Sequence, residues 1–136
     1  MDISIHDNIL LSYCVIADKR EIHFHTAFSN DGTSELTDVV FTGVVAYSFT
    51  NDRFETVIFD IEEVRPDEIY DEIYVDYRAL FEAGRPHCWP GRWNESEDSA
   101  LDYFINNDVK AYYLAPSIGM SGWVMAKSMK VVATPA

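Results

Sequence analysis

Alternating apolar and polar positions mark two strands near the start of the chain. Residues 21–28 follow the two-residue period of a strand that is buried on one face. The apolar face of this run consists of Ile22, Phe24, Thr26 and Phe28, and the other face of Glu21, His23, His25 and Ala27. Residues 9–17 form a second β-rich run, and the polar residues 18–20 between the two runs predict a hairpin.

Four further runs of β-branched and aromatic residues are bounded by turn-forming residues. They predict strands over residues 36–49, 54–64, 109–115 and 122–132. The first of these is apolar on both faces, as in a central strand, and Gly43 in its middle indicates a bulge. Together with the hairpin, these runs predict a sheet of about six strands.

Between residues 66 and 105 the apolar positions recur at the spacing of a helix. Pro66 and the two acids after it are typical of a first helical turn, and Gly84 marks the expected end of this helix. Ser96 is the expected N-cap of a second, shorter helix that extends to Ile105. The order β-β-β-β-α-α-β-β predicts a single α+β domain over residues 1–136, with a mainly antiparallel sheet and two helices packed on one face.

Composition and charge restrict the partners that this domain can have. The chain has 136 residues, of which 48% are hydrophobic, as expected for one globular domain. Acidic residues outnumber basic ones by 23 to 10, which gives a net charge of −13. A chain of this charge repels phosphate backbones and anionic lipid headgroups, so we expect neither nucleic acid nor a membrane as a partner.

The first residues do not follow the pattern of a targeting segment. No lysine or arginine precedes Lys19, whereas a signal peptide begins with a basic region. The apolar run 9–17 is also shorter than the roughly 20 residues of a membrane-spanning helix. We therefore expect a cytoplasmic location, in which Cys14 and Cys88 are free thiols.

The negative charge is concentrated in the middle of the chain. Residues 54–108 carry 15 acids and 4 bases, whereas residues 109–136 carry no acid and 3 lysines. On the first expected helix, carboxylates lie on the face opposite the apolar positions. Glu68, Asp71 and Glu72 form this face, and together with the nearby Asp76 we call them the acidic ridge. One-sided negative charge favours a basic protein partner and speeds its association.

A second candidate for the same interface lies between the two expected helices. Residues 84–93 contain two of the 3 tryptophans in the chain, together with two arginines and two prolines. Tryptophan and arginine are enriched at binding hot spots, and proline lowers the entropy lost when a loop is ordered. Trp89, Arg92 and Trp93 are therefore candidate binding residues. Alternatively, the indoles pack over the core and the arginines pair with the acidic ridge.

Two histidines form a weak candidate metal site. His23 and His25 are two residues apart on one strand, so their imidazoles point to the same face, about 7 Å apart. A two-residue hairpin loop places Cys14 opposite His23, and a tighter loop places it opposite His25. A three-residue loop would instead separate the thiol from the imidazoles. Asp60 or Glu62 is the expected fourth ligand. The alternative is that both histidines lie on a half-exposed sheet face with no metal.

Catalytic signals are weaker still. Asp60 and Glu62 have the spacing of a general acid–base pair, but solvated acids are also common where a strand leaves a sheet. The sequence contains no G-x-S-x-G elbow, P-loop, G-x-G-x-x-G fingerprint or H-E-x-x-H motif. We therefore predict no catalytic residue and no cofactor, and a non-catalytic role is favoured over an enzyme.

In size, acidity, tryptophan and tyrosine content and expected α+β pattern, the chain resembles small bacterial immunity proteins of polymorphic-toxin and contact-dependent inhibition systems. The resemblance carries over no family site residue. It implies an inhibitor that blocks the active cleft of a basic toxin domain, often a nuclease.

Two other classes of function remain open. One is a metal-binding or small-ligand-binding protein, or an enzyme, that uses the face carrying His23 and His25. The other is a self-associating structural subunit. In a homodimer, a second copy could cover the far side of the two-sided apolar run 36–49.

Overall fold

The computed structural model describes residues 5, 7–30, 33–50, 54–68 and 104–133, and strands dominate this part of the chain. All strand pairs are antiparallel. In chain order the strands are β1 (Asn8–Ile16), β2 (Glu21–Asn30), β3 (Thr33–Thr42), β4 (Ala46–Thr50), β5 (Val57–Val64), β6 (Lys110–Ile118), β7 (Ser121–Ala126) and β8 (Ser128–Ala133).

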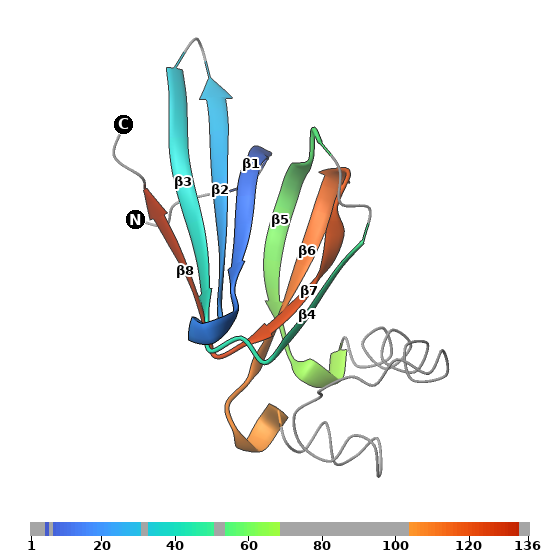
Figure 1. Cartoon of the computed structure of the whole chain (residues 1–136). Coiled ribbons are helices and arrows are strands. Elements are labelled where there is room, and N and C mark those ends of the chain that lie inside the picture. Colours follow the sequence, from blue (N-terminus) through green and yellow to red (C-terminus); the bar gives the residue numbers. More distant parts are fainter. Residues whose placement is uncertain (1–4, 6, 31–32, 51–53, 69–103, 134–136) are drawn as a thin grey trace, which may run out of the picture.

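The strands are hydrogen-bonded in the order β4-β7-β6-β5-β1-β2-β3-β8. Figure 1 shows that this sheet is bent into two leaves that meet at one end and spread apart at the other. The first leaf contains β1, β2, β3 and β8, and the second leaf contains β4, β5, β6 and β7. Apolar side chains on the facing sides of the two leaves can therefore share one core.

Two segments of chain cross from one leaf to the other where the leaves meet (Figure 1). Residues 43–45 join β3 to β4, and Lys127 joins β7 to β8. Gly43 has a φ of 63°, a left-handed conformation that glycine adopts without strain. The Lys127 N–H donates to the carbonyls of Thr42 at 3.1 Å and Gly43 at 3.2 Å, so the two crossings are held together.

These crossings correct the expected number of strands. The antiparallel sheet is confirmed, but the described residues form eight strands in place of about six. The runs 36–49 and 122–132 were each expected to be one strand, and each is divided where the chain changes leaf. The bulge expected at Gly43 is therefore a corner of the whole sheet.

The second junction between the leaves is narrow. β1 pairs with β5 only through Asn8 with Ile58 and Ile9 with Val57. Leu10 N–H also donates to the Thr56 carbonyl at 2.9 Å. Beyond this point β1 follows β2, with a register shift between Leu10 and Ser12, and the rest of β1 has no pairing with β5 in the described structure.

The main core fills the space between the leaves. Its fully buried aromatic residues include Phe24 of β2 and Phe41 of β3, whose ring centroids are 5.5 Å apart. Phe41 contacts Tyr112 of β6 at 5.6 Å, which joins the two leaves. A second cluster lies on the opposite side of β6 and β7, and consists of Ala46, Phe104, Val109, Ala111, Trp123 and Met125. β6 and β7 are therefore buried on both faces.

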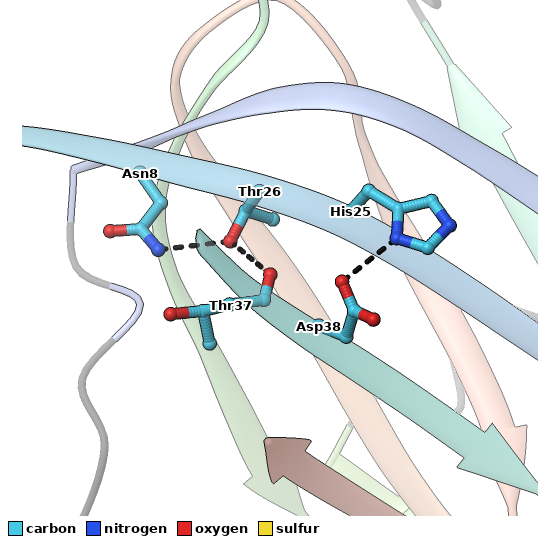
Figure 2. Close-up of polar contacts among 5 residues, drawn as sticks. All are labelled: Asn8, His25, Thr26, Thr37 and Asp38. Carbon is cyan, nitrogen blue, oxygen red and sulfur yellow. Dashed lines mark hydrogen bonds and ion pairs between the residues drawn. The ribbon is translucent and has the colours of Figure 1, made fainter. Parts of the chain in front are cut away.

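A buried polar network ties β1 to its neighbours close to the junction with β5 (Figure 2). Asn8 Nδ2 donates to Thr26 Oγ1 at 2.9 Å, and Thr26 Oγ1 donates to the Thr37 carbonyl at 2.7 Å. Asn8 and Thr26 are each 1% exposed, so both side chains depend on these partners in place of water.

The two expected helices are described only at their ends. Residues 66–68 and 104–106 are helical, and the rest of both expected helices lies outside the described residues, as does their packing on the sheet. The α+β class therefore stays a prediction, whereas a mostly antiparallel β-fold is shown. In the part of the chain that is described, no helix is long and apolar enough to cross a membrane.

Candidate functional site

His23, His25 and Cys14 lie on the outer face of the first leaf, as the alternation of β2 predicts. Cys14 pairs with His23 in the register of β1 and β2, and Ser12 pairs with His25. The connection is longer than the expected two-residue loop, because η1 (Ala17–Lys19) and Arg20 close the hairpin. Ile16 nevertheless pairs with Glu21, so the expected pairing of Cys14 with His23 is confirmed.

Each histidine is bound to a carboxylate of its own. His23 Nε2 lies 2.9 Å from Glu21 Oε1, two residues earlier on β2. His25 Nδ1 lies 2.8 Å from Asp38 Oδ1 on β3, a contact visible in Figure 2. These contacts orient both rings and engage one ring nitrogen of each histidine. Only the other nitrogen of each ring is then left to bind a metal.

The structure does not bring the remaining metal candidates to this face. Asp60 and Glu62 lie on β5 of the second leaf, which meets β1 only at Asn8 and Ile9. Asp60 Oδ1 accepts a hydrogen bond from the Ile61 N–H at 2.9 Å. Over the described ranges, no group of three or more His, Cys, Asp or Glu side chains could hold a metal ion. The geometry therefore supplies two histidines and one thiol on a shared face, without a ligand set.

The same face does not hold an activated nucleophile. Cys14 is an exposed free thiol opposite His23. Nucleophilic catalysis requires a hydrogen bond from the thiol to its base. No such bond joins Cys14 to His23 in the described structure, where His23 is engaged by Glu21.

Carboxylates lie close together at the end of β5, in the helical residues that follow it and just before β6. We call this set the acidic end, and it consists of Glu62, Glu63, Asp67, Glu68 and Asp108, all of which are exposed. Arg65 is bound within it, with Nη2 3.3 Å from Asp67 Oδ2 and Nε 3.2 Å from Glu68 Oε1. Arg65 and Lys110, which begins β6 beside the end of β5, are two bases against these five carboxylates, so the acidic end is negative.

The negative charge of the acidic end affects the ionisation of Tyr112, which lies in the core. Burial raises the pKa of the Tyr112 phenol above its usual value of 10.0, and the negative charges of Glu63 and Asp108 raise this pKa further. Both effects disfavour the phenolate, because it would be a buried anion beside two other anions. Glu63 and Asp108 therefore lie close enough together to act on one group.

This shift predicts how stability changes at alkaline pH. Because the folded-state pKa of Tyr112 is raised, its contribution to stability is complete below the unfolded pKa of 10.0 and is lost as pH rises through the folded pKa. Tyr112→Phe removes the ionisable group, so the free energy of unfolding should fall less steeply above pH 10 than in the wild type. Urea unfolding at pH 7 and at several values above pH 10 measures both slopes, and equal slopes would contradict the assignment.

Several candidate binding residues lie outside the described residues. Of the acidic ridge, only Glu68 is described, and its carboxylate is half-exposed and paired with Arg65. Asp71, Glu72 and Asp76 fall in the range that the structure leaves out, as do Trp89, Arg92 and Trp93. Their place in an interface stays a prediction.

A cavity that the sequence did not predict lies beside the hairpin. It has a volume of about 560 Å³ and includes Arg20 and Glu21 among its lining residues. Its other side is the crossing from β3 to β4, more than 20 residues further along the chain. Two segments so distant in the chain form this cavity, so no local sequence pattern could predict it. Gly43 at the crossing was the one local signal nearby.

In comparisons with known proteins, no family model, no curated protein and no solved structure matches this chain.

Proposed function

We propose that this chain is a non-catalytic binding protein for a basic protein partner, which docks on the acidic end. The observation that carries the proposal is the excess of exposed carboxylates over bases at the end of β5. Long-range attraction to such a surface raises the rate of association and selects partners of opposite charge.

The pairing within the acidic end supports this proposal. Asp67 and Glu68 are 47% and 48% exposed in spite of their ion pairs with Arg65. Exposed ion pairs of this kind contribute only about 0–1 kcal/mol to folding stability, so the fold gains little from this concentration of charge. Binding a basic partner would explain this concentration of carboxylates, which folding stability does not explain.

The resemblance to immunity proteins gives the proposal its specific form. In that form the basic partner is a toxin domain, and the acidic end, with Asp71, Glu72 and Asp76, covers its positively charged cleft. Trp89, Arg92 and Trp93 would then supply the contacts that hold the complex. The histidine face on the first leaf takes no part in this proposal.

A charge-neutralising variant tests the proposal. The tagged wild-type chain is used to recover its partner from native cells, and the affinity for the purified partner is then measured by calorimetry. Combining Glu63→Gln, Asp67→Asn and Glu68→Gln should weaken binding by at least about tenfold, since each exposed charge pair contributes up to about 1 kcal/mol. High salt should weaken the wild-type complex in the same direction.

A matched control separates the site from the overall charge. Asp18→Asn, Glu35→Gln and Glu55→Gln remove three exposed carboxylates that lie away from the acidic end. This control should bind almost as tightly as the wild type. Equal losses in both variants, or a recovered partner that is itself acidic, would contradict docking on the acidic end. For the toxin form, the partner expressed alone should arrest growth, and co-expression of the chain should restore it.

A further inference from the structure

The cavity beside the hairpin has the size of a small-molecule site. Its volume of about 560 Å³ is within the range of roughly 300–1,000 Å³ typical of ligand pockets. Val15 and Ile22 line it from the hairpin, and Val44 and Tyr47 line it from the β3–β4 crossing. It therefore lies between two segments that a bound molecule would bridge.

The cavity continues the core, because β1 leaves β5 early. Val15 pairs with Ile22, so it belongs to the core-facing side of the first leaf. Ile22 is completely buried, yet Val15 is 41% exposed. Tyr47 is 42% exposed although its ring contacts Phe49, which packs against the same core, at 5.3 Å. Core-facing apolar side chains are thus left uncovered at this opening in the described structure.

Two charged residues also line the cavity, and only one of them is engaged. Glu21 Oε1 is bound by His23 Nε2 at 2.9 Å. Arg20 has no ion pair and no side-chain hydrogen bond in the described part of the chain. Its backbone is fixed, because its carbonyl accepts from the Val44 N–H at 2.9 Å and its own N–H donates to the Ala17 carbonyl at 3.3 Å. The Glu21 carboxylate lies with His23 on the face of β2 opposite to Ile22, so the guanidinium of Arg20 is the charged group left to meet a ligand in the cavity.

We propose that this cavity binds a small amphipathic anion, with its carboxylate on Arg20 and its apolar tail against the partly exposed Val15 and Tyr47. A guanidinium binds a carboxylate through two parallel hydrogen bonds, which are stronger than bonds between neutral groups. Uncovered core residues favour an alkyl or aryl tail, which replaces water at an apolar surface. This site is separate from the acidic end and does not depend on the proposed function.

Calorimetric titration with three probes that share an eight-carbon chain, the carboxyl carbon included, tests the proposal: octanoate, 1-octanol and octyltrimethylammonium. Octanoate should bind saturably and at least about tenfold more tightly than the other two, since a charge-assisted hydrogen bond contributes more than a neutral one. Arg20→Gln should remove that advantage. The matched control is Lys19→Gln, which removes the same charge from the neighbouring residue of η1 and should leave octanoate binding unchanged.

A second variant tests the place of the tail. Val15→Trp adds bulk at the exposed side of the cavity, and should weaken octanoate and 1-octanol alike. Far-UV circular dichroism identifies any variant that fails to fold. Failure of the wild type to bind octanoate saturably would overturn the proposal. Equal affinities for octanoate and octyltrimethylammonium, or an equal effect of Arg20→Gln and Lys19→Gln, would overturn the role of Arg20.

Discussion

Replacing Gly122 with alanine should destabilise the fold by about 4 kcal/mol or more, at the upper end of the effects of single substitutions. Gly122 has a φ of 155°, which residues with a side chain rarely adopt. An added Cβ would overlap the Ser48 carbonyl oxygen and lie 3.0 Å from the Phe49 Cα. Both neighbours are backbone atoms of β4, so the overlap is relieved only by moving one strand away from the other. Urea unfolding measures the loss.

Gly43→Ala is the informative comparison for this variant. Gly43 also has a positive φ, of 63°, but an added Cβ would meet side-chain carbons of Lys127, at 2.9 Å. The Lys127 Cγ and the atoms beyond it can move, but its Cβ is fixed to the crossing. The expected cost is therefore the left-handed conformation, about 1–2 kcal/mol, plus a contact strain smaller than the overlap at Gly122. If both variants lose the same stability, close approach of β4 to β7 is not the reason for Gly122.

Phe24→Ala should lower the free energy of unfolding by about 3–5 kcal/mol, as expected for removing a fully buried aromatic ring. Phe24 is 0% exposed and contacts rings from several strands. Its centroid lies 5.9 Å from Tyr13 of β1, 5.5 Å from Phe41 of β3 and 5.7 Å from Phe49 of β4. Because β4 belongs to the second leaf, the loss includes contacts that hold the leaves together.

Two measurements separate this effect from a general loss of apolar surface. Leu11→Ala removes an apolar side chain that is 58% exposed at the register shift of β1, and should change stability by less than about 0.5 kcal/mol. A double-mutant cycle with Phe49→Ala should give a coupling of about 0.5–1.5 kcal/mol, the usual range for an aromatic pair. A coupling of zero would show that the two rings stabilise their leaves independently.

The parts of the fold that depend on local pattern were predictable. The alternation from Ile22 to Phe28 gives the correct faces of β2, because a strand has a fixed period of two. The hairpin limited the register to a few alternatives, and the pairing of Cys14 with His23 was one of them, although η1 was not expected. The end of β2 was placed two residues too early, because polar residues such as Ser29 continue the ladder.

The division into two leaves depends on distant contacts, and sequence pattern alone does not reveal it. Gly43 indicated only a bulge within the run 36–49, and nothing in residues 122–132 marks Lys127 as a second corner. Of the two carboxylates that bind the histidines, one could be predicted from local sequence and the other could not. Glu21 shares a strand face with His23 and was within reach of local reasoning, whereas Asp38 reaches His25 only through the β2–β3 register.

The pairing of β3 with β8 also determines when the molecule can be completed. Thr42 pairs with Ser128, so the two strands meet across 86 residues of chain. Synthesis proceeds from the N-terminus, so β1, β2 and β3 leave the ribosome well before the strand that covers the outer edge of β3. Until then β3 presents unpaired backbone groups, and it could pair with the same strand of another nascent chain. The slow step of folding is expected to be this closure, because contacts between distant residues form late.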